Sequence, residues 1–178
     1  MEAKMTVPEV WLRGPVPNVP APLQPLAHAL LQAGEDAERV LSSINDDALW
    51  ERPGGAAAVG FHIRHAAQAL DRLFTYARGE GLTDAQRSAL RSEKEPGGTS
   101  GELGTLFSHA ITAALAQLAG TNPASLGDAR EVGRARLPST VLGLLSHGAE
   151  HTARHVGQAI TTSIVVTNVQ VHDPSSSR

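Results

Sequence analysis

The chain contains no cysteine among its 178 residues. This absence excludes disulfide bonds, a cysteine nucleophile, and zinc or iron–sulfur sites built on thiolate ligands. A metal site in this chain must therefore use histidine, aspartate or glutamate. Eight histidines are present, and three of them fall close together at positions 147, 151 and 155. Histidine is thus the first candidate metal ligand.

Blocks of positive charge and long apolar runs are also missing. Lys and Arg number 15 against 18 Asp and Glu, a formal net charge of -3. No basic block provides the footprint that nucleic acid or an anionic membrane surface requires. No apolar run is long enough to span a bilayer, and the N-terminus lacks the apolar stretch of a signal peptide. We therefore expect a cytoplasmic protein that acts on a small-molecule substrate and binds neither nucleic acid nor a membrane.

Composition and periodicity together predict one helical domain. A content of 41% hydrophobic and 19% charged residues is typical of a globular chain. Residues 1–22 are rich in proline, which fixes the backbone and removes donors, so they predict an extended arm. Beyond the arm, apolar residues recur at steps of three and four, the pattern of amphipathic helices, in four long segments at about 23–44, 56–78, 99–120 and 138–165.

The predicted fold is therefore all-α, a four-helix bundle over residues 23–167 with an extended Pro-rich N-terminal arm and a short extra helix. Thr83 with Gln86 forms a capping-box pattern that opens the short helix, and Thr99 with Glu102 forms another that opens the third long helix. The polar stretch 121–137 indicates a connection, because strand patterns are nearly absent. Residues 168–178 are expected to be a polar tail, frayed at its end.

The fourth predicted helix carries a stripe of histidines. His147, His151 and His155 recur every four residues, so they lie on one side of the helix. Each step of four turns about 40° toward the apolar side, which makes His155 the most inward and His147 the most peripheral. Two histidines at i and i+4 can coordinate one ion, and His151 with His155 is the better pair. The alternative is that each histidine is satisfied by hydrogen bonds and holds no metal.

A metal site also needs a ligand from a second helix. The second predicted helix offers His62, nearer its apolar side, and His65, at the border of that side. The helical wheel does not choose between them, and a hydrogen-bonded core or border histidine is the alternative for either. His28 and His109, on the other two long helices, are expected to be structural.

Two other residues share a helix side with these histidines and are candidates for cofactor binding. Arg72 lies two turns beyond His65 and could hold an anionic group, although a salt-bridged arginine is the simpler interpretation. Gln158 lies two turns beyond His151 and could orient a ligand from behind.

Two segments of the chain resemble the DinB/YfiT-like superfamily. In LWERPGGAAAVGFHIRHAAQALDRLFTYARGE (49–80), His65 lies five residues after Gly60. In LPSTVLGLLSHGAEHTARHVGQAI (137–160), the motif H-x3-H-x-G-Q is filled by His151, His155, Gly157 and Gln158. The resemblance implies a four-helix bundle with a metal site of His65, His151 and His155, commonly occupied by zinc or nickel. It selects His65 over His62, and the extra histidines at 62 and 147 depart from the family pattern.

The resemblance also implies a chemistry. Some members of the superfamily look like transferases or isomerases that use a low-molecular-weight thiol such as mycothiol or bacillithiol. Three neutral histidines leave coordination positions open, where a divalent ion lowers the pKa of a thiol or water. The leading hypothesis is therefore metal-assisted activation of a thiol or water, for transfer to a small electrophile or for its hydrolysis. Bundles of this kind often pair through a helix face, so we expect a homodimer.

Two alternatives compete with this hypothesis. The run His147-Gly-Ala-Glu150-His151 matches the inverzincin motif H-x-x-E-H, in which Glu150 would be the base; it leaves His155 without a role. The other alternative is not an enzyme but a metal-containing bundle that binds a small molecule or a partner, for example in a stress response, because fold and metal do not fix activity.

Overall fold

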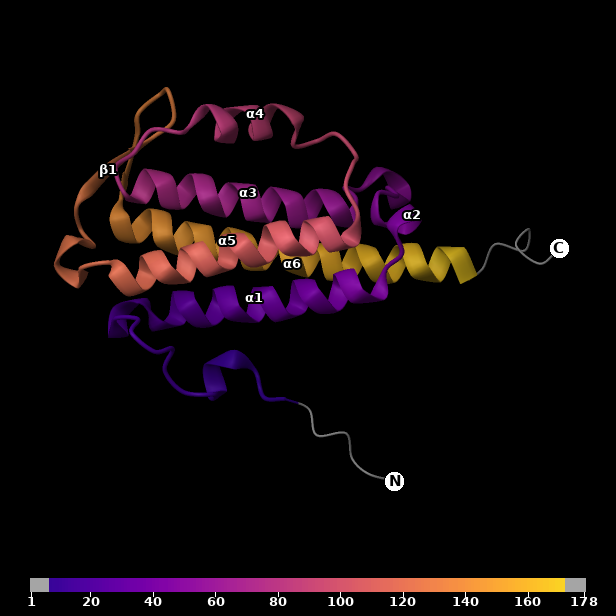
Figure 1. Cartoon of the computed structure of the whole chain (residues 1–178), viewed down its shortest axis with the longest axis horizontal. Helices are drawn as coiled ribbons and strands as arrows, with labels where there is room; N and C mark the ends of the chain where they lie inside the picture. The colour runs from indigo at the N-terminus through magenta and orange to yellow at the C-terminus, as the bar shows by residue number, and fades with distance from the viewer. Residues whose placement is uncertain (1–6, 172–178) are drawn as a thin grey trace.

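The structure is a computed structural model that describes residues 7–171. Within that range the chain forms six α-helices, one short antiparallel hairpin and four 3-10 turns (Figure 1). The α-helices are α1 (Gln24–Ser43), α2 (Asp46–Leu49), α3 (Val59–Ala77), α4 (Asp84–Ser92), α5 (Ser100–Gly120) and α6 (Val141–Val171). The strands are β1 (Ala129–Val132) and β2 (Leu137–Thr140), and the 3-10 turns are η1 (Val10–Leu12), η2 (Ala21–Leu23), η3 (Pro53–Gly55) and η4 (Pro123–Ser125).

The four long helices form the predicted bundle. α3 packs most extensively on α6, α1 also packs on α6, and both α1 and α3 pack on α5 (Figure 1). α1 and α3 therefore lie on one diagonal, and α5 and α6 on the other. Large apolar side chains from the predicted stripes fill the space between the helices, among them Leu23, Leu30, Ile63, Leu70, Leu118 and Leu145. The prediction of an all-α four-helix bundle is confirmed.

Both predicted capping boxes are present. The Thr83 hydroxyl accepts from the backbone N–H of Gln86, whose side chain accepts from the backbone N–H of Thr83. Thr99 and Glu102 form the same reciprocal pair at the start of α5. These contacts satisfy N–H groups that a helix start leaves without partners. The short extra helix is α4, which covers the outer side of α3 (Figure 1).

The N-terminal arm runs along α1. Within it, η1 and η2 form two single turns rather than a fully extended chain. Val10 is buried, whereas the neighbouring Trp11 is exposed, so the arm packs on the bundle through only some of its apolar side chains. The arm is held by the Arg13 guanidinium, which donates to both Glu35 oxygens. His28 contacts the Gly14 carbonyl at 3.0 Å, in keeping with a structural role. Residues 1–6 lie outside the described range.

The connection between α5 and α6 differs from the prediction. It contains the hairpin of β1 and β2, in which Pro138 pairs with Glu131. α6 therefore begins at Val141, after Pro138, and it extends through Val171 rather than ending near Val165. The hairpin was missed because its strands are only four residues long, too short for alternation to stand out. The rest of the predicted tail, residues 172–178, lies outside the described range.

α5 is more apolar than the sequence interpretation allowed. By length and composition it could span a bilayer, with a mean hydropathy of 1.2. In the bundle, one side of this helix packs into the core through Leu103, Phe107, Ile111, Ala114 and Leu118. Only 28% of the apolar window is buried, so packing against α1 and α3 covers one side of this helix.

Candidate metal centre

The close packing of α3 against α6 brings the predicted histidines together. Gly148 makes this possible, because a Cβ at that position would lie 2.8 Å from the Phe74 ring of α3. The two helices run antiparallel, since His62 faces His155 while His65 faces His151. The second predicted helix thus faces the histidine stripe of the fourth, as a site with ligands from two elements requires.

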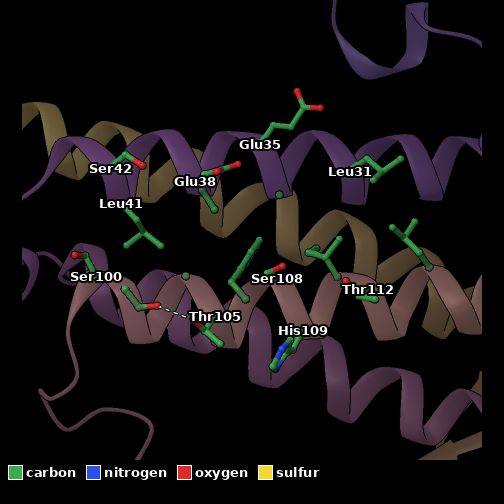
Figure 2. A pocket seen from close by; sticks show the side chains of 17 residues that line it. Leu31, Glu35, Glu38, Leu41, Ser42, Ser100, Thr105, Ser108, His109 and Thr112 are labelled. Atoms are coloured by element: carbon green, nitrogen blue, oxygen red, sulfur yellow. Dashed lines mark hydrogen bonds between the residues drawn. The ribbon is translucent and has the colours of Figure 1, made fainter.

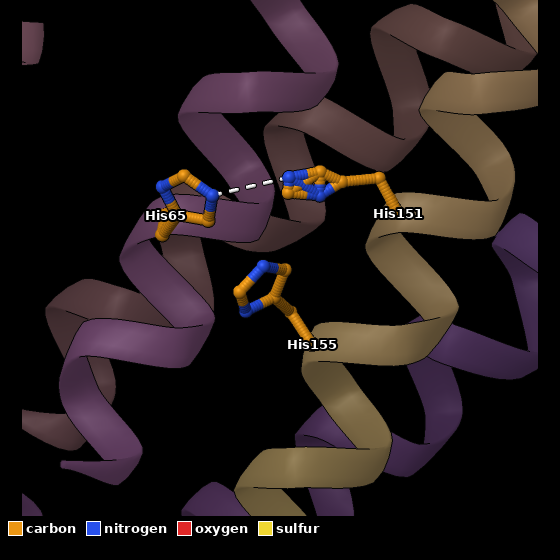
Figure 3. A group of neighbouring side chains, drawn as sticks. All are labelled: His65, His151 and His155. Carbon is orange, nitrogen blue, oxygen red and sulfur yellow. Dashed lines mark hydrogen bonds between the residues drawn. The ribbon is translucent and has the colours of Figure 1, made fainter. Parts of the chain in front are cut away.

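His65, His151 and His155 form a compact cluster at this interface. One ring nitrogen from each lies within 4.8 Å of the other two, and the Nε2 atoms of His65 and His151 are 3.1 Å apart. Figure 3 shows the rings of the two α6 histidines turned toward the ring from α3. All three side chains are half-buried, so the cluster can be reached from solvent. The structure therefore brings together the three residues that the resemblance selects.

Burial keeps two of these imidazoles neutral. The pKa values of His151 and His155 are lowered to about 4, first because burial disfavours the charged ring and then because of the charge on His65. At neutral pH both rings carry a free lone pair, which is the form that binds a metal ion.

Glu93 lies behind His65 and was not predicted from the sequence. It follows the last turn of α4, is buried, and places Oε2 2.8 Å from His65 Nδ1. The ring N–H does not point straight at this oxygen, and Nδ1 has no well-directed hydrogen bond. The other oxygen, Oε1, accepts from Arg72 at 2.9 Å. Burial acts to raise the pKa of Glu93, but His65 and Arg72 together outweigh it, and the pKa is lowered.

The loop that carries Glu93 is fixed by long-range contacts. The Arg64 guanidinium donates to the carbonyls of Glu95 and Gly97, and the Trp50 indole donates to the carbonyl of Gly98 at 3.0 Å. Gly60 lets the indole approach α3, because a Cβ there would lie 2.8 Å from the ring. Gly60 therefore has a structural role one turn before the histidines of α3.

His62 partners a histidine of the cluster. Its side chain is buried, and its Nδ1 lies 3.0 Å from His155 Nδ1. Burial, followed by the charge on His65, lowers the pKa of His62. A neutral His62 can accept a hydrogen from Nδ1 of His155, which would leave Nε2 of His155 as the ligand atom. The two candidates on α3 are thus both at the centre, in different positions.

The remaining candidates lie outside the cluster. Arg72 is paired with Glu93, and its Nη1 is buried without a partner. Gln158 is exposed on α6, and cofactor binding by either residue stays a prediction.

His147 is exposed and lies 3.6 Å from exposed Glu150. This geometry opposes the inverzincin alternative, because the three-histidine group excludes His147.

A wide hollow of the described chain lies away from the cluster. A groove of about 810 Å³ runs between α1 and α5 and includes Glu35, Glu38, Thr105, Ser108, His109 and Thr112 (Figure 2). None of the three clustered histidines lines it. His109 is exposed there rather than packed in the core.

The donor set of the cluster suits a divalent ion such as zinc or nickel. Imidazole nitrogen is a preferred ligand of both, and three protein ligands with open positions are typical of catalytic zinc sites. His151 Nδ1 is buried and has no hydrogen-bond partner in the described chain, so its neighbour Nε2 is the atom turned to the cluster. His65 and His155 each have a second residue behind them, as metal-bound histidines usually do. The residues present therefore fit the ion that the resemblance implies.

Comparison with known proteins agrees with this geometry. The family model described as DinB superfamily matches residues 29–159, most of the bundle and all three clustered histidines. The chain belongs to the DinB superfamily. Among solved structures, this DinB-superfamily bundle is similar to a conserved protein from Enterococcus faecalis, with a TM-score of 0.64 and 18% identity over 82% of this chain and 97% of the other. At that identity the similarity supports the fold alone. No curated protein matches the chain.

Proposed function

We propose that this DinB-superfamily protein is a metal-dependent enzyme that uses one zinc or nickel ion held by His65, His151 and His155. The observation that carries the proposal is the convergence of three imidazole nitrogens within 4.8 Å from two helices. Isolated histidines satisfied by hydrogen bonds would not need this arrangement. Family membership adds support, because metal binding is common in DinB-like proteins.

The proposed reaction is the attack of a thiol on a small electrophile. The alternative is hydrolysis of the electrophile by water. When bound, the ion would lower the pKa of a thiol or water in an open position and so supply a nucleophile near neutral pH. A low-molecular-weight thiol is the proposed co-substrate. The three rings are only half-buried, which supports access of a ligand to the centre.

The chain's own residues would set the geometry of the centre. Glu93 orients the His65 ring, and Arg72 holds Glu93 in place. His62 lies 3.0 Å from His155 Nδ1, and as the acceptor of that contact it would leave Nε2 of His155 free for the ion. These partners would let the three imidazoles point at one place before any ligand arrives.

Metal content measured by elemental analysis tests the proposal. The purified protein is loaded with zinc or nickel, and His65→Ala, His151→Ala and His155→Ala are compared with the wild type. We expect about one ion per wild-type chain and loss of the ion in each variant. His147→Ala is the matched control, since His147 is an exposed histidine on the same side of α6. A wild-type protein that cannot be loaded with either metal would refute the proposal.

Activity is measured second, with the loaded protein. Consumption of a small thiol by an activated halide or epoxide, and hydrolysis of activated esters, would be followed with and without chelator. Metal binding without any turnover would favour the non-catalytic alternative.

The homodimer and the cytoplasmic location stay predictions. Sedimentation of the loaded protein tests whether it is a homodimer.

A further inference from the structure

A small pocket adjoins the metal centre on the side of the loop that carries Glu93. It has a volume of about 290 Å³ and is lined by Trp50, Arg52, Phe61, Lys94, Pro96 and the alanines at 57 and 58. Pockets near this size hold small molecules, at the low end of the usual range. Its walls come from α3, the segment before α3, and the loop after α4.

The pocket and the centre share a wall. The Phe61 ring stacks on the His65 ring, with centroids 5.4 Å apart and an interplanar angle of 13°. The Phe61 and His62 rings also meet edge to face, with centroids 5.7 Å apart. Lys94, which lines the pocket, directly follows Glu93, which contacts His65. A molecule in the pocket would therefore touch the ring that supports a metal ligand.

Two cations at the pocket have no acidic partner within residues 7–171. The side chain of Lys94 forms no ion pair or hydrogen bond in that range. Arg52 donates only to the carbonyls of Gly55 at 3.2 Å and Ala56 at 3.3 Å, which do not neutralise its charge. Several other exposed arginines of the chain, such as Arg13 and Arg87, pair with carboxylates. The pocket thus keeps positive charge available for a ligand.

The rest of the lining is apolar and aromatic. The indole of Trp50, the ring of Phe61 and the ring of Pro96 supply flat surfaces. The Arg64 guanidinium lies 4.5 Å from the centroid of the Trp50 ring and helps to hold it. Flat apolar surfaces bind planar or apolar groups, and cations at the edge bind a carboxylate or sulfonate.

We propose that this pocket binds a small organic acid, with its planar or apolar body between Trp50 and Phe61 and its anionic group at Lys94 and Arg52. The pocket binds the acid whether or not the ion is present. The acid is then the substrate of the enzyme, and its other end reaches the metal centre around Phe61. This second step rests on the proposed function.

Binding of a matched pair of probes tests the inference. 2-Naphthoate and the neutral 2-naphthalenemethanol share one planar body and differ in charge. Titration calorimetry on the zinc-loaded protein should show naphthoate binding about tenfold more tightly, the size expected for one charge-assisted hydrogen bond. Equal affinity for the two probes, or no binding of naphthoate, would overturn the proposal.

Variants locate the site. In Lys94→Gln the preference for naphthoate should fall by about fivefold or more, while the affinity for the alcohol stays the same. Arg91→Gln is the control, because Arg91 is an exposed cation on α4 outside the pocket. Ala57→Phe should fill the pocket and remove binding of both probes, with the helical circular dichroism spectrum unchanged. A Lys94→Gln variant with the wild-type preference would refute the assignment.

The same titration on the His151→Ala/His155→Ala protein separates this inference from the proposed function. Naphthoate binding that survives in this metal-free variant supports the pocket by itself. If the wild type cannot be loaded with metal but still binds naphthoate through Lys94, the proposed function fails and the pocket stands. If the wild type holds metal but has no preference for naphthoate, the pocket fails and the metal centre stands.

Discussion

The carboxylate of Glu93 lies 2.8 Å from Nδ1 of His65, on the side of the ring away from His151. The pairing joins a loop residue after α4 to a residue in the middle of α3. A carboxylate behind a metal-bound histidine fixes the ring orientation and makes its other nitrogen a better ligand. Glu93 is therefore part of the centre, although its own oxygens are not among the clustered ligand atoms.

Replacing Glu93 should weaken metal binding without removing a ligand. We expect Glu93→Gln to lower the zinc affinity by about 10- to 100-fold, because glutamine keeps the size and loses the charge. Competition with a chromogenic chelator measures the change. Glu95→Gln is the control, since Glu95 is an exposed acid in the same loop. An affinity equal to that of the wild type would show that Glu93 does not support His65.

Arg72 should matter for stability more than for ligand binding. Its side chain is 11% exposed and that of Glu93 is 7% exposed, so Arg72→Met would leave a buried carboxylate without its cation. Loss of one partner of a buried pair costs about 3 kcal/mol, which urea unfolding of the metal-free protein would detect. Arg87→Met, which breaks an exposed pair with Asp84, should cost about 1 kcal/mol or less. A stable Arg72→Met protein would instead favour the predicted role in holding an anionic ligand.

The bundle and the histidine cluster could be predicted because both depend on local periodicity. Steps of three and four define the side of each helix that is buried, and the same arithmetic orders His147, His151 and His155 from outside to inside. The structure agrees for His147, which is exposed, whereas His151 and His155 are both half-buried, so their relative order stays a prediction. The choice of His65 over His62 needed the family resemblance, because both residues point into the same interface.

Glu93 could not be predicted because its position depends on the path of a loop. Arg64 and Trp50 hold that loop through backbone carbonyls, which carry no side-chain signal in the sequence.

The exposure of Gln158 has a different cause. It lies one turn past His155, near the level where α3 begins at Val59, so α6 there has little of α3 to face. Helical-wheel reasoning orders residues around one helix and does not show where its neighbour ends.

Acidification should destabilise the metal-free protein through the two α6 histidines. Their pKa values are about 4 in the folded chain and 6.5 for an ordinary histidine, so the unfolded chain binds protons first. The stability that comes from keeping His151 and His155 neutral is present above about pH 6.5 and declines as the pH falls toward about 4. Urea unfolding of chelator-treated protein at about pH 7.5 and about pH 5 measures it. The His151→Gln/His155→Gln variant should lose less stability between these values, and an equal loss would contradict the assignment.

Two glycines of α6 should respond to alanine in opposite directions. At Gly148 a Cβ would lie 2.8 Å from Phe74 and 3.3 Å from Leu70, whereas at Gly157 it would meet no atom within 4 Å. Gly148→Ala should therefore lower the free energy of unfolding by about 1–3 kcal/mol, because it overpacks the contact between α3 and α6.

Gly157→Ala should raise the free energy of unfolding by about 0.5–1 kcal/mol, since alanine is the better helix former and the site is open. Urea unfolding measures both changes on the metal-free protein. Because Gly148 lets α6 approach α3 closely, Gly148→Ala should also loosen zinc binding, while Gly157→Ala should leave the zinc affinity unchanged. A Gly148→Ala protein with wild-type stability and zinc affinity would contradict the idea that close packing of α3 on α6 aligns His65 with His151.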